Sequence, residues 1–421
     1  MDSEAAPNSL TEQAPSGGNA LVDTVADWLM EQALGTTSVE NLLDQCSLRL
    51  NAAGIPVWRA NIGFQILHPL YRAMSLTWNR ETGIEETNQF IGGAGSSDIW
   101  QSSPQRYLVE NNLPFLRRKL SGPEANLDFE LFADLQERGA TDYFGYVVPF
   151  SGDDFGDYQA NGVVGSWATD RPGGFNDNDL QSLLRIQQRL AVACKMVIKE
   201  QITKNVLAAY LGPDAGKQVL SGQIQLGDGE TTHAVIWFSD LRNSSGLADT
   251  LPPEDFIILI NEYFQCMAGA VLESNGEVLR FIGDAVLAIF PIRGGHDDEK
   301  EACATALAAA RDAVERMAEL NNARQADKKD PLGFGIGLHV GDVMYGNIGV
   351  PERVEFSVVG PAANEAARIE TLTKTLGHQV IFSDHFTAAL EEDWQSLGKH
   401  ELRGVGDPME VFYLADVGTK T

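Results

Sequence analysis

Cysteine is scarce in this sequence of 421 residues. The four cysteines, Cys46, Cys194, Cys266 and Cys303, lie far apart, and none belongs to a Cys-X-X-Cys pair. This spacing excludes a disulfide framework and a structural zinc site, and it fits a reducing compartment. We also find no apolar run that approaches the roughly 18 residues of a membrane-spanning helix. We therefore expect a soluble, cytoplasmic protein that does not bind membranes.

Basic residues are also few, since 31 Lys and Arg stand against 59 Asp and Glu and give a formal net charge of −28. A field of this sign repels nucleic acid and anionic lipid, so neither is an expected partner. A nucleotide can bind only through a locally cationic site or through metal ions. The segment 1–18 carries three acids and no Lys or Arg, and so lacks the pattern of a secretion signal.

The chain divides into four segments by composition. Residues 1–20 are rich in Ser, Pro, Gly and Ala and predict a disordered tail. We interpret 21–195 as an α+β domain, 196–230 as a helical linker and 231–418 as a second domain. In the first domain, apolar spacing predicts helices over 22–34, 39–53 and 175–211, and strands over 57–68, 71–78, 143–150 and 162–168.

The second domain has a recognisable order of elements. An apolar strand over 231–240 is followed by a helix over 253–274 and an Asn-Gly turn at 275–276. Further segments predict strands over 277–282 and 284–290, a helix over 297–320, a strand pair over 334–341 and 343–349, and a helix that begins near Ala362. The order β-α-β-β-α-β predicts a ferredoxin-like fold.

Two acidic residues are expected at strand ends in this domain: Asp240 ends a strand in FSDL, and Asp284 in FIGDAVLAIF comes just after a turn. Together they can hold hard cations such as Mg²⁺, which bring phosphates with them; alternatively, each only caps a turn. Asn364 and Arg368 stand four apart on the predicted helix and hence on one face. Such a pair suits a ribose oxygen and an anionic transition state, or it is a solvated helix face. Arg403 precedes a glycine, where a cation can reach a terminal phosphate.

Five segments in order extend this pattern: FSDLR, GEVLRFIGDAVLAIF, GIGLHVGDVMYGNIG, EFSVVGPAANEAARIE and ELRGVGDPMEVF. Together they resemble the catalytic domain of class III nucleotide cyclases over residues 231–415. The resemblance implies that Asp240, Asp284 and the main chain at Leu241 hold two Mg²⁺ or Mn²⁺ ions per active site. It also implies a homodimer in which each site combines residues of both chains.

The resemblance assigns further roles to the second group of residues. Asn364 orients the ribose, Arg368 stabilises charge on the α-phosphate, and Arg403 contacts the terminal phosphates. Two positions select the base, and here they hold Arg280 and Ser357. The serine hydroxyl can accept from the adenine amino group, so the pair favours ATP and an adenylate cyclase. Arg280 can also donate to guanine, which leaves a guanylate or dual-specificity cyclase, or a silent nucleotide-binding module, as alternatives. A diguanylate cyclase is disfavoured, because its GG(D/E)EF signature is absent.

The first domain resembles a GAF-type sensor domain, most visibly in SWATDRPGGFNDNDLQSLLRIQQRLAVAC. The resemblance implies a regulatory domain with a small-molecule ligand, joined to the enzyme by a long helix. His68 is a candidate haem or metal ligand, or is simply structural. The tryptophans of this half line a pocket for a flat ligand or fill the core: Trp28, Trp58, Trp78, Trp100 and Trp167.

Overall fold

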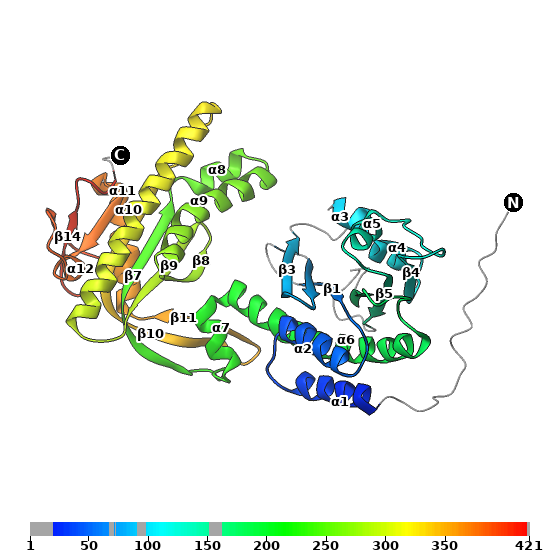
Figure 1. The fold of residues 1–421 in the computed structure, drawn as a ribbon. Helices are drawn as coiled ribbons and strands as arrows, with labels where there is room; N and C mark the ends of the chain where they lie inside the picture. Colours follow the sequence, from blue (N-terminus) through cyan, green and yellow to red (C-terminus); the bar gives the residue numbers. More distant parts are fainter. Residues whose placement is uncertain (1–19, 67–70, 72, 91–97, 151–161, 419–421) are drawn as a thin grey trace. The chain divides into compact units, whose positions relative to one another are not determined.

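The structure, a computed structural model, describes residues 20–66, 71, 73–90, 98–150 and 162–418 (Figure 1). The predicted tail, apart from Ala20, and the candidate ligand His68 lie outside these residues. The chain forms two compact units, Met1–Val206 and Leu207–Thr421. Each unit has a sheet and a hydrophobic core of its own.

Unit 1 is built on an antiparallel sheet of six strands in the order β3-β2-β1-β6-β5-β4. The register sets Asn61 of β1 opposite Thr77 of β2 on one side and Ser166 of β6 on the other. The strands predicted over 57–68, 71–78, 143–150 and 162–168 are confirmed with small shifts of their ends. The six strands are β1 (Arg59–Gln65), β2 (Ala73–Asn79), β3 (Gly83–Phe90), β4 (Phe115–Lys119), β5 (Asp142–Pro149) and β6 (Gly162–Thr169).

Helices cover both faces of this sheet (Figure 1). The main core lies between one face and the helices α1 (Ala20–Leu34), α2 (Val39–Ala52) and α6 (Asp177–Leu211). All three confirm predicted helices. A smaller cluster packs α4 (Pro104–Glu110) and α5 (Glu130–Glu137) against the half of the other face that β4, β5 and β6 form, and α3 (Asp98–Gln101) precedes α4.

The helix α6 begins with reciprocal capping. The Asn176 side chain accepts from the backbone N–H of Asp179, and the Asp179 carboxylate accepts from the backbone N–H of Asn176. These bonds satisfy N–H groups that the first helical turn leaves without partners. The helix then continues for 35 residues, and the boundary between the two units falls within it, after Val206.

Unit 2 contains a sheet in the order β13-β14-β12-β10-β7-β9-β8, with β11 paired to β10. The elements β7, α9, β8, β9, α10 and β10 follow the predicted β-α-β-β-α-β order. The strands are β7 (Gly229–Leu241), β8 (Glu277–Ile282), β9 (Ala285–Ile292), β10 (Phe334–Val350), β11 (Arg353–Val359), β12 (Val380–Ser383), β13 (Gln395–His400) and β14 (Met409–Tyr413). The helices are α7 (Pro213–Leu220), α8 (Ser244–Thr250), α9 (Pro253–Glu273), α10 (His296–Ala326), α11 (Pro361–Leu376) and α12 (Asp384–Thr387).

One prediction about this sheet is wrong. The sequence suggested a strand pair over 334–341 and 343–349, but these residues form the single strand β10 of 17 residues. Gly341 and Asp342 continue the ladder opposite Ala234 and His233 instead of turning. The Asp342 carboxylate lies 2.7 Å from His233 Nδ1 across the two strands, so this acid serves a cross-strand contact.

The helix α9 corrects the expectation that no segment is apolar enough to cross a membrane. By length and composition alone, Pro253–Glu273 meets that requirement. Its side chains Tyr263, Met267 and Val271 are fully buried in the core formed with β7, β9 and α10. Such burial is typical of a core helix in a globular domain.

Two glycines let α11 lie directly on β10. A Cβ atom at Gly337 would stand 2.5 Å from the backbone nitrogen of Glu370 and 2.6 Å from the carbonyl oxygen of Ala366. At Gly335 it would stand 2.3 Å from Thr373 Oγ1. Because real Cβ atoms do not approach other atoms so closely, only glycine permits this contact. The close packing fixes the position of α11 on the sheet.

Candidate functional site

The predicted metal-binding pair lies at the end of the central strand β7. Asp240 is paired with Ala285, the first residue of β9, so the adjacent Asp284 is brought beside it. Asp284 occupies the turn between β8 and β9, where Gly283 adopts a φ of 63° that favours glycine. Burial raises the pKa of Asp240, and the nearby Asp284 carboxylate raises it further. The structure thus brings the two predicted acids together.

A lysine that the sequence reasoning missed contacts this pair. Lys374 of α11 donates to Asp240 Oδ2 at 2.8 Å, and this bond opposes the increase in the pKa of Asp240. Lys374 stands one helical turn after Glu370, whose burial raises its pKa to about 7. Only the spacing of four between Glu370 and Lys374 signals a shared helix face in the sequence. Nothing in the sequence pairs that face with Asp240.

The donor set fits a divalent cation that binds together with phosphate. Carboxylate oxygens are hard ligands, and Mg²⁺ is commonly held by one or two carboxylates together with substrate phosphates. Among the described residues, no group of three or more His, Cys, Asp and Glu side chains is arranged to hold a metal by itself. Asp240 and Asp284 therefore need further oxygens, such as a main-chain carbonyl near Leu241 or the phosphates of a nucleotide. The ammonium group of Lys374 already binds Asp240 as a cation would.

We expect the variant Lys374→Gln to bind Mn²⁺ about fivefold more tightly, because the ammonium group competes with the metal for Asp240. The effect is modest because the lysine side chain is 45% exposed. The apparent affinity is measured from the rise in melting temperature as Mn²⁺ is titrated. Lys300→Gln, at an exposed lysine of α10, is the matched control. An unchanged or weaker response of Lys374→Gln would show that Lys374 does not compete.

The two predicted base-selecting residues also lie near each other. Arg280 of β8 donates through Nε to Glu355 of β11 at 2.7 Å. Ser357 lies two residues further along β11 and therefore on the same face as Glu355. Its side chain is only 3% exposed, and among the described residues its Oγ has no hydrogen-bond partner. An unpaired buried hydroxyl is costly, so this atom is suited to a polar ligand atom.

Glu355 is a second residue that the sequence reasoning missed. The alternation of a strand could have revealed it, because residues two apart share a face. Its carboxylate holds Arg280 in place and adds an acceptor beside Ser357. The predicted base-selecting region thus contains an arginine, a glutamate and a serine, whereas the sequence had indicated only the arginine and the serine.

The remaining candidates lie apart from the acidic pair. Asn364 and Arg368 both lie on the exposed face of α11, as predicted from their spacing. Asn364 precedes Lys374 by ten residues, or about 15 Å of helix. Arg403 is exposed between β13 and β14. Within the described part of the chain, neither Arg368 nor Arg403 forms an ion pair with Asp240 or Asp284, and Asn364 forms no hydrogen bond with either acid. One chain thus presents two separate half-sites.

A buried histidine anchors the start of α11. His339 of β10 is 2% exposed, and burial lowers its pKa to about 4. The ring is therefore neutral near pH 7, and its Nε2 lies 2.9 Å from Glu365 Oε2, close enough to donate a hydrogen bond. Glu365 directly precedes the buried Ala366 and follows Asn364. This contact holds the backbone that carries Asn364.

Comparison with known proteins gives a consistent picture of unit 2. Residues 228–416 match the family model described as "Adenylate and Guanylate cyclase catalytic domain". An uncharacterised protein of Mycobacterium bovis is 33% identical over 215 residues, which cover 49% of this chain and 37% of that protein. An adenylate cyclase of Anabaena cylindrica is 30% identical over 163 residues, which cover 38% of this chain and 31% of that protein. The chain thus spans about a third of the length of these curated relatives.

Solved structures show the same resemblance. The structure of a bacterial light-regulated adenylyl cyclase is 29% identical and covers 45% of this chain and 93% of that chain, with a TM-score of 0.39. The guanylyl cyclase Cya2 is 28% identical and covers 45% of this chain and 95% of that chain, also with a TM-score of 0.39. One of these two structures is thus of an adenylyl cyclase and the other of a guanylyl cyclase.

Proposed function

Because residues 228–416 form a class III nucleotide cyclase catalytic domain, we propose that the protein converts ATP into 3′,5′-cyclic AMP and pyrophosphate. The observation that carries the choice of ATP is the buried Oγ of Ser357, which has no hydrogen-bond partner among the described residues. A hydroxyl can accept a hydrogen bond from the adenine amino group, while Arg280 donates to a ring nitrogen. One edge of adenine would then form hydrogen bonds with both the Ser357 hydroxyl and the Arg280 guanidinium group.

The proposed chemistry assigns each residue a task. Asp240 and Asp284 hold two Mg²⁺ or Mn²⁺ ions. Bound cations of this kind neutralise phosphate charge and lower the pKa of the ribose 3′-hydroxyl. The Asn364 amide orients the ribose, and Arg368 donates to the α-phosphate oxygens where negative charge develops. Arg403 pairs with the terminal phosphates.

In this proposal the 3′-oxygen attacks the α-phosphorus in line, and pyrophosphate leaves with the pair of electrons from the broken bond. No protein nucleophile is required. All four cysteines are buried, and burial raises the pKa of Cys303 in unit 2 to about 12. A thiol of this kind is not ionised near pH 7 and does not compete with the ribose oxygen.

The separation of the half-sites supports a site shared between two chains. Asp240 and Asp284 of one chain would face Asn364 and Arg368 of the other. A twofold axis then creates two equivalent sites per homodimer. This arrangement explains why Asn364 and Arg368 are exposed and why Arg368 has no ion-pair partner among the described residues of a single chain.

Regulation by the N-terminal half is part of the same proposal. Leu190, Cys194 and Ile198 of α6 are buried in the core of unit 1. Leu211, at the end of the same helix, packs against the cluster that contains Ile236 and Phe356 in unit 2. A continuous helix that belongs to both cores can carry a signal from a GAF-like domain over 21–195, through a linker over 196–230, to a catalytic domain over 231–418.

We also propose that the protein is located in the cytoplasm.

We expect purified protein to form cyclic AMP from ATP and little cyclic GMP from GTP when each is offered with Mg²⁺ or Mn²⁺.

We expect Ser357→Ala to reduce kcat/KM for ATP by about tenfold, because the adenine amino group loses its acceptor. Ser245→Ala, at an exposed serine of α8, is the control. Cyclic GMP as the main product would refute the choice of ATP and favour the guanylate cyclase, for which Glu355 offers an acceptor to the guanine N–H groups.

A further inference from the structure

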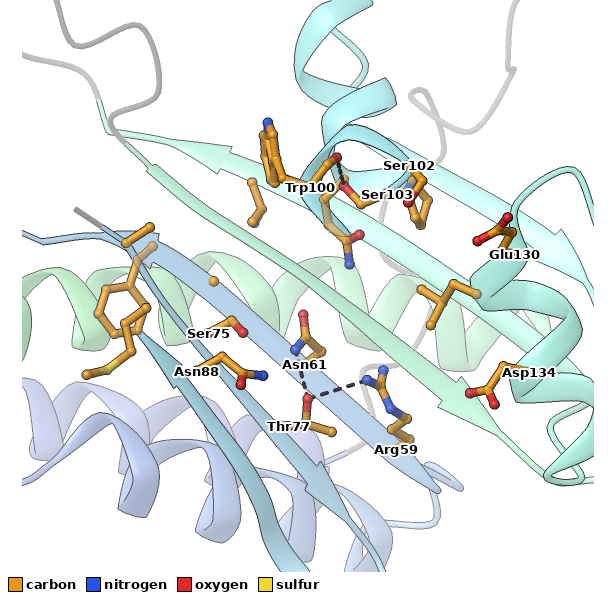
Figure 2. A pocket seen from close by; sticks show the side chains of 18 of the residues that line it. Arg59, Asn61, Ser75, Thr77, Asn88, Trp100, Ser102, Ser103, Glu130 and Asp134 are labelled. Carbon is orange, nitrogen blue, oxygen red and sulfur yellow. Dashed lines mark hydrogen bonds between the residues drawn. The ribbon is translucent and has the colours of Figure 1, made fainter. Parts of the chain in front are cut away.

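Unit 1 contains a cavity of about 490 Å³ that the cyclase chemistry does not use. It lies between the sheet face carrying β1, β2, β3 and β6 and the segment of α3, α4 and α5 (Figure 2). This volume is in the range of sites for small molecules. The cavity belongs entirely to unit 1, and none of its lining residues contributes to the candidate site in unit 2.

The floor of the cavity is polar where simple packing would favour apolar residues. Along β1, Ala60 and Ile62 face the main core, while Arg59 and Asn61 alternate with them and face the cavity. On β2 the same alternation puts Ser75 and Thr77 in the floor. A sheet face that served only to pack helices would be apolar, as it is where β4 and β5 meet α4 and α5. The polar floor therefore indicates a ligand.

Hydrogen bonds join the polar side chains of the floor. Asn61 Nδ2 donates to the carbonyl oxygen of Leu76 at 2.9 Å and to Thr77 Oγ1 at 3.0 Å. Both amide hydrogens are thereby used, so Asn61 Oδ1 is left as an acceptor. Arg59 donates to Thr77 Oγ1 at 3.4 Å, and Figure 2 shows its guanidinium group beside that hydroxyl. The floor thus offers a cation and an acceptor close together.

The charges of the lining balance. Arg59 and Arg138 stand against Glu130 and Asp134. Arg138 already pairs with Asp134 at 3.9 Å and with Glu85 at 3.7 Å. The lining therefore has no excess positive charge for a phosphorylated ligand. It suits a molecule that carries one positive and one negative group.

The two ends of the cavity differ in character. Figure 2 shows Glu130 and Asp134 on one side, projecting from α5, and Trp100 of α3 on the opposite side. Pro104 and Val164 add apolar surface. Of the five tryptophans considered in the sequence, Trp100 is the only one in the lining, whereas Trp58, Trp78 and Trp167 are buried in the cores.

We propose that this cavity binds a free α-amino acid with an apolar or aromatic side chain. The α-carboxylate pairs with Arg59, for which a planar carboxylate is a matching partner. The α-ammonium group donates to Asn61 Oδ1 and to Glu130. The side chain extends toward Trp100 and is held by aromatic and apolar contact. The proposal concerns binding in unit 1 and does not depend on the reaction proposed for unit 2.

Calorimetric titration of the full-length protein tests the proposal with L-phenylalanine and L-leucine as probes. Phenethylamine lacks the carboxylate, 3-phenylpropanoate lacks the ammonium group, and adenosine and glucose represent other ligand classes. We expect saturable binding of at least one amino acid, with both truncated analogues bound about tenfold more weakly or worse. Because the protein has seven tryptophans, a fluorescence change on binding reports contact with Trp100 only if Trp100→Phe abolishes it.

Two variants of the same helix locate the site. Glu130→Gln removes the carboxylate in the cavity and is expected to weaken amino-acid binding by about tenfold. Glu137→Gln changes an exposed glutamate of α5 outside the lining and should bind as the unaltered protein does. Equal melting temperatures of the two variants exclude a folding defect. The proposal is overturned by absence of amino-acid binding, by equal binding of the truncated analogues, by equal affinities of the two variants, or by binding of adenosine or glucose alone.

Discussion

The variant Asp284→Ala is expected to lose cyclase turnover by about a thousandfold or more. The carboxylate lies beside Asp240 at the end of β7, and the pair is the part of the described structure that fits a divalent cation bound with phosphate. Loss of one carboxylate leaves a single acid that Lys374 already occupies. The cation would then bind too weakly to position the phosphates. The measurement is the rate of cyclic AMP formation at saturating ATP across a range of Mn²⁺ concentrations.

The matched control for this variant is Asp255→Ala, at an exposed acid in the first turn of α9. It changes the net charge equally and should keep nearly full turnover. Asp284 lies in a turn and is partly exposed, so Asp284→Ala should keep its melting temperature in the absence of metal. Near-normal turnover of Asp284→Ala would refute its role as a metal ligand. The same test applies to Asp240→Ala, although that change also frees Lys374.

Mixing two inactive variants is expected to restore about a quarter of the normal turnover. Asp284→Ala lacks an acid of one half-site, and Arg368→Ala lacks the guanidinium group of the other. After random exchange of subunits, half of the dimers contain one chain of each kind. In such a dimer, one of the two sites takes its acids from the Arg368→Ala chain and its arginine from the Asp284→Ala chain, and is intact.

Each variant alone should be nearly inactive, because every homodimer then lacks one group in both sites. The double variant Asp284→Ala/Arg368→Ala, mixed with an equal amount of Asp284→Ala, is the control, since no combination of these chains restores a complete site. Subunit exchange is verified separately with differently tagged chains. Absence of recovery despite verified exchange would show that the acids and Arg368 act within one chain.

The order of elements in unit 2 was predictable because turns and apolar runs mark it locally. The helix α9 was placed within a residue of its ends because Pro252 precedes it, Pro253 begins it and an Asn-Gly turn follows it. The β10 strand was misread because Gly341 and Asp342 have the composition of a turn, whereas cross-strand pairing with β7 keeps them extended. Long-range pairing overrides local preference here.

The candidate site was predictable to a different degree. Asp240, Asp284, Asn364 and Arg368 came from short segments, and the structure places them at a strand end, in a turn and on one helix face. Their roles remain predictions. Lys374 could not be found in that way, because its partner Asp240 lies 134 residues away in the sequence. Glu355 is signalled only by its alternation with Ser357 on one strand, and nothing local pairs it with Arg280. The cavity of unit 1 is built from seven elements and has no local signature.

The contact of α11 with Gly335 and Gly337 limits which inherited changes this protein can tolerate. The variant Gly337→Ala retains every residue that has been assigned to the nucleotide or to the metal. The added methyl group would nevertheless push α11 away from β10. A classification of variants by the chemistry of the altered residue alone would call this change neutral. The packing of α11 on β10 therefore predicts that Gly337→Ala impairs the proposed activity although it alters none of the assigned groups.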